Sequence, residues 1–355
     1  MAGPGDGYRT EEVRLAARNH GMPLEALREE ITPAGLHYLL IHFDIPHVDP
    51  GTWRLDVGGL VRNPLRLSLE DLASRSTQTA AVTLECAGNG RAELEPRPVS
   101  QPWGHEAVGT ARWTGVPLGE VLADAGVDDE AVEVLFTGLD RGIDGGEEQD
   151  YERSLAFAEA MRPEVLLAWE MNGRPLPPQH GFPLRLVVPG WYGMTHVKWL
   201  RRITVLDRPF QGYQQAHAYR LRSSDDEPGT PLTRILPRSL MEPPGIPEFL
   251  SRQRHLDAGS HTLRGRAWSG WAPVGRVEVS TDGGRSWSDA VLEPAPGPYA
   301  WRGWTFAWDA GAGEHELCSR ATDEAGNVQP LDATWNLGGY ANNSVQRLRV
   351  VVREA

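Results

Sequence analysis

The C-terminal part of the chain alternates between short β-rich runs and turn residues, and this pattern constrains the fold more than any other feature of the sequence. Its clearest turn is Thr281-Asp282-Gly283-Gly284, where glycine supplies the positive φ angle that a tight hairpin needs. A run of roughly seven short strands over about 100 residues is typical of an immunoglobulin-like β-sandwich. We therefore predict such a sandwich, with strands at 262–267, 274–280, 286–290, 301–308, 313–322 and 347–352.

The remaining residues are numerous enough for a second domain. The chain has 355 residues, more than the roughly 250–300 at which a single hydrophobic core stops growing. Strand patterns are mixed with two short helical patterns, which predicts an α+β domain over residues 36–220. The strands are expected at 80–85, 132–137, 184–188 and 203–206, and the helices at 68–72 and 117–125. We predict a partly helical lead-in over 1–35, and a C-terminal domain over 221–355 that begins with a Pro-rich, charged linker at 221–260.

Charge and cysteine content argue against several classes of protein. A net charge of -13 repels a polyphosphate backbone, so nucleic acid is not expected as a partner. Cys86 and Cys318 permit at most one disulfide. The chain has no apolar run long enough to span a membrane, and its first residues lack the apolar core of a signal peptide. As written, the sequence predicts a cytoplasmic protein, or a periplasmic one if a leader was trimmed.

Cys86 is the first candidate for chemistry. It follows the strand-like run 82–85 and precedes Ala87-Gly88-Asn89-Gly90-Arg91, whose small residues permit a tight turn. We expect the thiol at the mouth of this turn, where a nearby guanidinium would favour the thiolate, the form that binds metals. The alternative is a buried structural cysteine.

Histidines and cations provide further candidates. His180, Arg185, His196 and Lys198 surround one predicted strand, and side chains on the adjoining loops could converge on a phosphate. The alternative is a solvated basic cluster. No glycine-rich nucleotide fingerprint occurs, which disfavours a nucleotide cofactor.

A zinc site is not expected in the early segment. His37, His42 and His47 lie five residues apart in what reads as a strand, and residues at that spacing do not share a strand face.

Several motifs together resemble the sulfite oxidase family over nearly the whole chain. The most specific is Val82-Thr83-Leu84-Glu85-Cys86-Ala87-Gly88-Asn89, which is similar to the family's cysteine-bearing strand and turn. The other matching segments, in family order, are 169–173, 175–177, 180–185 and 190–200 in the first domain, and 277–280, 282–284, 287, 320–323 and 335–337 in the second.

This resemblance implies a molybdenum cofactor, Mo-molybdopterin, with Cys86 as the protein ligand of the metal. The matching positions imply these cofactor-binding residues: Tyr38, His42, Cys86, Asp140, His180, Arg185, His196, Val197 and Lys198. Among them, Arg185 and Lys198 would meet the cofactor phosphate, and Asp140 would accept hydrogen bonds from the pterin. Arg91 and Tyr219 are implied as catalytic residues beside Cys86, Arg91 by stabilising negative charge and Tyr219 by hydrogen bonding or proton transfer.

The implied reaction is oxygen-atom transfer, most simply the oxidation of sulfite to sulfate or of a related sulfur oxyanion. Electrons would pass to a separate acceptor such as a cytochrome, because the chain carries no haem-attachment or flavin segment. By the same resemblance, the C-terminal domain would be a dimerisation domain and the protein a homodimer.

Two departures from the family concern the substrate. Leu40 and Gly338 stand where family sulfite oxidases carry arginines that surround sulfite. Each charge-assisted hydrogen bond contributes roughly 1.5–3 kcal/mol, so their loss would weaken sulfite binding by about two to four orders of magnitude. His217, Arg220 and Arg222 are candidates to compensate. A molybdoenzyme of the same fold acting on a sulfoxide or N-oxide is therefore one alternative. A non-catalytic, immunoglobulin-like interaction protein is the other.

Overall fold

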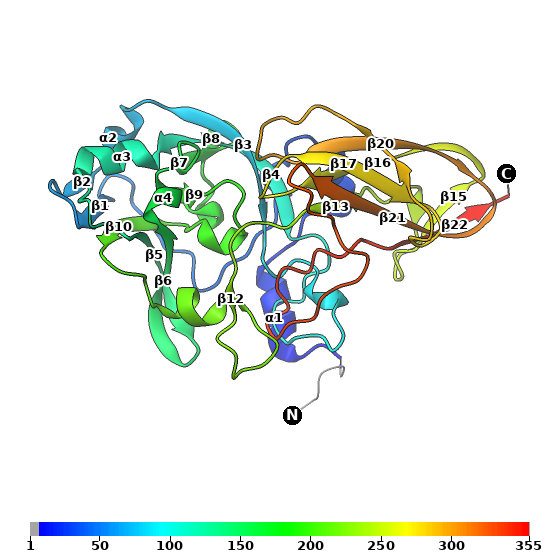
Figure 1. Cartoon of the computed structure of the whole chain (residues 1–355), viewed down its shortest axis with the longest axis horizontal. Coiled ribbons are helices and arrows are strands. Elements are labelled where there is room, and N and C mark those ends of the chain that lie inside the picture. Colours follow the sequence, from blue (N-terminus) through cyan, green and yellow to red (C-terminus); the bar gives the residue numbers. More distant parts are fainter. Residues whose placement is uncertain (1–6, 355) are drawn as a thin grey trace.

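The chain folds into two lobes that lie side by side along the long axis of the molecule (Figure 1). The computed structural model describes residues 7–354, so the predicted lead-in lies partly outside the described residues. Each lobe is built mainly from two β-sheets, and the helices are few and short.

Two sheets form the first lobe. In one, the strand order is β2 (Leu65–Leu67), β1 (Leu55–Gly59), β10 (Leu200–Leu206), β5 (Glu133–Asp144) and β6 (Glu147–Ala156). In the other, it is β3 (Gln78–Glu85), β4 (Val108–Pro117), β7 (Leu166–Met171) and β8 (Arg174–Pro175), with β9 (Arg185–Val187) also paired to β7. Apolar side chains from both sheets share one buried core, for example Leu55, Phe136, Leu167 and Leu186.

Short helices complete the first lobe. The two predicted helices are confirmed as α2 (Leu69–Ala73) and α3 (Leu118–Ala125). Ser68 caps α2 by accepting a hydrogen bond from the backbone N–H of Asp71 at 3.1 Å. The other helices are α1 (Thr10–Arg18) and α4 (Phe157–Ala160), with 3₁₀ turns η1 (Leu24–Arg28), η2 (Arg91–Glu93), η3 (Pro178–His180) and η4 (Gly193–Thr195), and a π-helical turn η5 (Gln214–Ala218).

The second lobe contains two further sheets around their own apolar core. One has the order β13 (Arg238–Met241), β16 (Gly259–Trp268), β20 (Arg302–Ala310) and β19 (Val291–Leu292). The other has β14 (Ile246–Pro247), β15 (Arg254–Asp257), β22 (Leu348–Arg353), β21 (Gly313–Asp323), β17 (Val274–Ser280) and β18 (Ser288–Asp289). Gly283 and Gly284, between β17 and β18, adopt φ angles of 76° and 88°, as the turn prediction requires.

Two expectations about local structure were wrong. The segment of Tyr38 and His42 lies outside the named strands, and its one ladder contact is an isolated bridge between Leu39 and His20. The predicted linker 221–260 contains β13, β14 and β15 and the start of β16, besides the small pair β11 (Arg220–Leu221) and β12 (Thr230–Pro231). These strands escaped notice because they are short and carry prolines and arginines instead of an alternating apolar pattern.

The segment between β21 and β22 returns from the second lobe to the turn after β3. The backbone N–H of Ala341 donates to the carbonyl of Ala87 at 2.8 Å, and the Asn342 amide donates to the carbonyl of Gly90 at 2.8 Å. Arg91 Nε donates in turn to the carbonyl of Gly338 at 2.9 Å. The surroundings of Cys86 are therefore built from both lobes.

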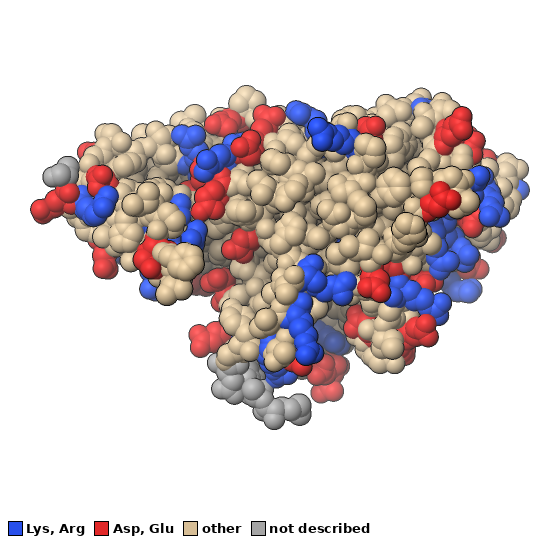
Figure 2. All heavy atoms as spheres, turned by 180° about the vertical axis from the view of Figure 1, so that it is seen from behind, with Lys and Arg blue, Asp and Glu red and all other residues tan. Residues whose placement is uncertain are grey.

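Both cysteines are free, so the single disulfide that the sequence permitted is not formed. Over the described residues, no helix combines the length and apolarity needed to cross a membrane. On the rear face, charged side chains gather mainly at the edges and leave a broad, largely uncharged middle (Figure 2).

The helix α1 is fixed by an ion pair of Glu12, which is 1% exposed. The Glu12 carboxylate accepts hydrogen bonds from the Arg97 guanidinium and from the backbone N–H of Arg9. Burial raises the pKa of Glu12, but the hydrogen bond and charge of Arg97 outweigh burial and hold the pKa below its ordinary 4.5. A carboxyl group with a lowered folded-state pKa stabilises the fold above its unfolded pKa, and that stability is lost as the pH falls.

We therefore expect α1 to loosen below about pH 4.5, and the Glu12→Gln variant to loosen it at neutral pH. Hydrogen exchange over Thr10–Arg18 measures this. Glu11→Gln is the control, because Glu11 is exposed on the same helix. Equal protection of α1 in all three proteins at neutral pH would count against the role given to Glu12.

Candidate active site

Cys86 lies at the junction of two cavities, directly after β3. The strand is exposed at its start and buried over its last four residues, which carries the chain into the interior before the turn. The Cys86 N–H donates to the carbonyl of Ala107 at 2.9 Å, and the Asn89 N–H donates to the carbonyl of Cys86 at 3.0 Å. Cys86 lines both a narrow inner cavity and a wide outer cavity. Cys86 is buried, with only 8% of its surface exposed. Its thiol nevertheless faces two cavities and is not enclosed by aliphatic side chains.

The expected effect of Arg91 on the thiol is present but is not dominant. Burial raises the pKa of Cys86, and the charge of Arg91 lowers it by less. Arg91 thus favours the thiolate, as expected, but burial outweighs its charge in the protein alone. A positive metal ion at the sulfur would supply the missing stabilisation of the thiolate.

A buried polar network fixes the turn, and sequence reasoning missed it. Glu85, the residue before Cys86, accepts hydrogen bonds from Arg238 Nη1 at 2.7 Å, from Trp268 Nε1 at 2.8 Å and from the Asn89 amide at 2.9 Å. Arg238 and Trp268 belong to β13 and β16 of the second lobe, more than 150 residues away. This separation left no motif from which their role could be predicted.

The narrow inner cavity collects nearly all the predicted cofactor-binding residues. Its lining includes Tyr38, His42, Cys86, Asp140, His180, Arg185, His196 and Lys198, together with Tyr219. Val197 is the exception, since its side chain is fully buried in the apolar core of the first lobe. The backbone N–H of Val197 donates to Thr195, and its carbonyl accepts from Leu186.

Three polar atoms around the inner cavity are buried without a hydrogen-bond partner among the described residues. They are Asp140 Oδ1, Arg185 Nε and His37 Nε2. Buried polar groups are nearly always satisfied, so such a group indicates a missing ligand or water. A carboxylate, a guanidinium and an imidazole match the mixed donors and acceptors of a pterin and the charge of its phosphate. The residues present thus fit the implied cofactor. His37, rejected above as a zinc ligand, belongs to this group by position.

Burial sets the ionisation of the groups around the inner cavity. It raises the pKa of Asp140 and lowers the pKa of Lys198, and the opposite charge of each group counteracts the shift in the other. Lys198 Nζ donates to the carbonyls of Leu40 at 2.8 Å and Gln179 at 3.2 Å. Burial, helped by the cations nearby, also lowers the pKa of His180 to about 2 and of His196 to about 3. Both imidazoles are therefore neutral at physiological pH.

The ring of His196 is already committed within the protein. Its Nδ1 accepts from the Val188 N–H at 3.1 Å, and its Nε2 donates to the Trp191 carbonyl at 3.0 Å. His196 thus borders the inner cavity without a free ring nitrogen. Its backbone carbonyl accepts a hydrogen bond from Arg185 Nη2 at 3.4 Å.

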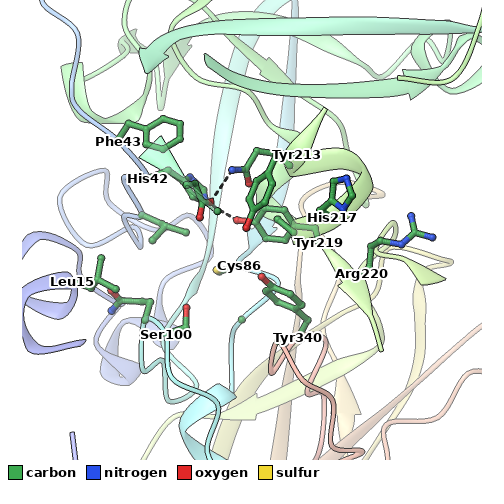
Figure 3. Close-up of a pocket in the computed structure, with 18 of the residues that line it drawn as sticks. Leu15, His42, Phe43, Cys86, Ser100, Tyr213, His217, Tyr219, Arg220 and Tyr340 are labelled. Carbon is green, nitrogen blue, oxygen red and sulfur yellow. Dashed lines mark hydrogen bonds between the residues drawn. The ribbon is translucent and has the colours of Figure 1, made fainter. Parts of the chain in front are cut away.

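The wide outer cavity opens on the other side of Cys86 and measures about 860 Å³. Around it, His42, Tyr219 and Tyr340 point toward the centre, where the sulfur of Cys86 lies (Figure 3). The π-helical turn η5 presents Tyr219, whose hydroxyl lies 2.6 Å from His42 Nε2. All three predicted catalytic residues, Cys86, Arg91 and Tyr219, line this cavity.

The outer cavity also contains the positions at which the sequence departs from the family. Leu40 and Gly338 both line it, as do His217, Arg220 and Arg222, the predicted candidates to compensate. Tyr340 was missed by sequence reasoning. A Cβ atom on Gly338 would lie 2.3 Å from the Tyr340 ring, so this ring occupies the space that a side chain at position 338 would need.

A second overlooked residue is Arg153, which lies behind the wall of the outer cavity. It is 2% exposed, its guanidinium is 5.6 Å from the centre of the Tyr219 ring, and it donates to the carbonyl of Gln214 in η5. It therefore supports the turn that carries Tyr219. A lone arginine in the middle of β6 gave no signal of this contact.

Family models match both lobes of the chain, and similar proteins match it over nearly its whole length. Residues 42–214 match the family described as "Oxidoreductase molybdopterin binding domain", and residues 241–353 match "Mo-co oxidoreductase dimerisation domain". Sulfite oxidase from Gallus gallus is 38% identical, with 97% of this chain and 79% of that protein covered. Mitochondrial sulfite oxidase from Mus musculus is 39% identical, with 98% of this chain and 67% of that protein covered.

Two further matches are more distant in sequence. NAD(P)H nitrate reductase from Hordeum vulgare is 35% identical, with 96% of this chain but only 42% of that protein covered. The crystal structure of the sulfane dehydrogenase SoxCD from Paracoccus pantotrophus superposes with a TM-score of 0.81 at 27% identity, with 100% of this chain and 96% of that chain covered.

Proposed function

The chain belongs to the molybdopterin-binding oxidoreductase family that includes the sulfite oxidases, and from this membership we propose that it oxidises a sulfur oxyanion by oxygen-atom transfer. It is an enzyme whose cofactor is Mo-molybdopterin, which removes the non-catalytic alternative. The observation that supports the proposal is the position of Cys86 between a polar inner cavity and an open outer cavity.

Each group of residues has a distinct part in the proposal. Cys86 would ligate the metal, and the inner-cavity residues, including Asp140, Arg185 and Lys198, would hold the pterin and its phosphate. The bound cofactor supplies a two-electron acceptor able to exchange an oxygen atom with a substrate. Tyr219 would orient the substrate, because its hydroxyl is held by His42 at 2.6 Å and faces the same cavity as Cys86.

Electrons would leave to a separate one-electron carrier of the cytochrome class. The second lobe would be an immunoglobulin-like sandwich and would form the interface of a homodimer. The dimer rests on the matched dimerisation domain, and the carrier rests on the sequence, in which no haem-attachment or flavin segment was found. A cytoplasmic or periplasmic location remains an expectation from the sequence.

The test of the proposed function is steady-state oxidation of sulfite by molybdenum-loaded enzyme with ferricyanide as acceptor. Turnover at millimolar sulfite, proportional to molybdenum content, is the expected result. Reduction of a sulfoxide or N-oxide by the same enzyme, without any oxidation of sulfur(IV) compounds, would favour the alternative instead. The observation that favours this alternative is that Leu40 and Gly338, the two positions that depart from the family's arginines, both line the outer cavity.

Arg185 provides a test of the inner cavity. Its guanidinium is 5% exposed and its Nε lacks a partner among the described residues. Arg185→Met should lower cofactor affinity by roughly ten- to a hundredfold, because a charge-assisted hydrogen bond contributes about 1.5–3 kcal/mol. Molybdenum content after gel filtration measures the loss. The control is Arg202→Met, which removes an exposed arginine from β10. Equal metal retention in both variants would argue against phosphate binding by Arg185.

A further inference from the structure

The outer cavity is much larger than a small inorganic anion requires. Its volume of about 860 Å³ lies in the range of roughly 300–1,000 Å³ that is typical of pockets for organic ligands. Its aromatic lining residues are Phe43, Trp103, Tyr213, Tyr219 and Tyr340. Leu15 of α1, labelled in Figure 3, and the exposed Ile143 of the β5–β6 hairpin add aliphatic surface to the lining. These side chains give the otherwise polar lining an apolar portion against which a carbon group can pack.

Arg91, which lines the outer cavity together with Cys86, already uses two of its three guanidinium nitrogens within the protein. Arg91 Nε donates to the Gly338 carbonyl at 2.9 Å, and Nη1 donates to the Gln101 carbonyl at 2.9 Å. The guanidinium carbon lies 5.2 Å from the centre of the Tyr340 ring, which covers it. Only Nη2 remains without a partner in the described part of the chain. Arg91 can therefore offer a substrate one nitrogen and one positive charge.

The other cations of the outer cavity are also engaged. Arg220 donates to the carbonyls of Pro228 and Gly229, and Arg222 lies 3.7 Å from the carboxylate of Asp225. Asp144 and Glu147 line the same cavity and add negative charge. These two carboxylates offset part of the positive charge of the three arginines and so weaken the attraction of the lining for an anion with two charges.

We infer that the substrate is an organic sulfinate, R–SO₂⁻, in which a carbon group replaces one oxygen of sulfite; this inference rests on the proposed function. The single negative charge matches the single positive charge of Arg91, and the R group lies along the aromatic lining residues named above, which form the aromatic wall of the cavity. The reaction balances as R–SO₂⁻ + H₂O → R–SO₃⁻ + 2H⁺ + 2e⁻. The sulfur lone pair forms the new S–O bond, and sulfur loses two electrons. Water loses both O–H bonds, its protons leave to solvent, and the electrons pass singly to a one-electron carrier protein.

The inference is tested by comparing benzenesulfinate with sulfite on molybdenum-loaded enzyme, with ferricyanide as acceptor. We expect kcat/KM for benzenesulfinate to exceed that for sulfite by at least about tenfold, equivalent to ~1.4 kcal/mol. An equal or larger value for sulfite would overturn the inference and leave the proposed function standing. No turnover with either compound would overturn the proposed function as well.

A binding measurement supplies a readout that does not depend on turnover. Calorimetric titration of the oxidised holoenzyme with the two products, benzenesulfonate and sulfate, should show benzenesulfonate bound at least about tenfold more tightly. Tighter binding of sulfate would overturn the assignment of the aromatic wall to the R group.

Two matched variants test the charge argument. Leu40→Arg adds a guanidinium at the junction of the two cavities, and Ile143→Arg adds the same group at the rim, where Ile143 is 74% exposed. Leu40→Arg should shift the ratio of kcat/KM values toward sulfite by about tenfold, whereas Ile143→Arg should hardly change it, because water and salt screen an exposed charge. An unchanged ratio in metal-loaded Leu40→Arg would overturn the argument. If Leu40→Arg loses its metal, the same ratio of kcat/KM values is measured for Tyr340→Leu instead. Loss of the preference for benzenesulfinate in that variant would support the inference, and an unchanged preference would overturn it.

Discussion

Replacing Cys86 with serine is expected to abolish oxidation activity while leaving the fold intact. Among the described residues, Cys86 provides the one sulfur that lines both cavities, and a hydroxyl is a much poorer ligand than a thiolate for a metal that prefers soft donors. Changes to outer-shell partners of a metal ligand already cost roughly 10–100-fold in affinity or activity, so loss of the ligand itself should cost more than about a hundredfold. Turnover per bound molybdenum, together with the visible absorption of the metal–sulfur bond, measures the effect.

Cys318→Ser is the matched control for this experiment. Cys318 is 1% exposed, lies in β21 of the second lobe and does not line either cavity. Its replacement should lower the melting temperature slightly, because a hydroxyl is then buried, but should leave turnover per molybdenum unchanged. If Cys86→Ser retained more than a tenth of the activity, or if both variants lost activity equally, Cys86 would not be the metal ligand.

Local patterns in the sequence were sufficient for the centre of the site. The strand that ends at Glu85 and the small residues that follow it are contiguous, so the position of Cys86 in a turn could be predicted. The glycine pair at 283–284 and the capped helix at Ser68 are equally local and are confirmed. Such features depend on backbone preferences that neighbouring residues set.

Contacts made across the chain could not be predicted in this way. Arg238 is 153 residues from Glu85, and Tyr340 reaches the outer cavity only because the segment before β22 folds back to the turn after β3. The strands inside the predicted linker, such as β13, are stabilised by pairing and burial in the second lobe rather than by their own sequence pattern. Tertiary contacts override weak local preferences at such positions.

The two lobes therefore function as one structural unit around Cys86. The first lobe supplies the cysteine and the inner cavity, and the second lobe supplies Arg238 and Trp268 as buried partners of Glu85 and one wall of the outer cavity. A change deep in the second lobe should consequently alter the site. This coupling explains why the segment that carries Gly338 and Tyr340 is as much a part of the site as the turn itself.

Removing one member of the buried Glu85–Arg238 pair is expected to destabilise the protein strongly. Arg238 is 1% exposed and Glu85 2% exposed, and their side chains lie 2.7 Å apart. Arg238→Met leaves a buried carboxylate without its cation, which typically costs about 3–5 kcal/mol. The double variant Glu85→Gln with Arg238→Met removes both charges and should recover part of this loss. Urea unfolding followed by tryptophan fluorescence measures the differences in the free energy of unfolding.

Arg353→Met provides the comparison, because Arg353 and Asp257 form an ion pair of similar length, 2.7 Å, at the surface, where the side chains are 53% and 66% exposed. Exposed pairs of this kind contribute only about 0–1 kcal/mol, so this variant should unfold almost like the unmodified protein. Arg238→Met should also lower molybdenum content, since Glu85 directly precedes Cys86 and the turn would lose its anchor. Equal unfolding free energies for Arg238→Met and Arg353→Met would show that the second lobe does not fix the cysteine turn, because a buried and an exposed pair would then contribute alike.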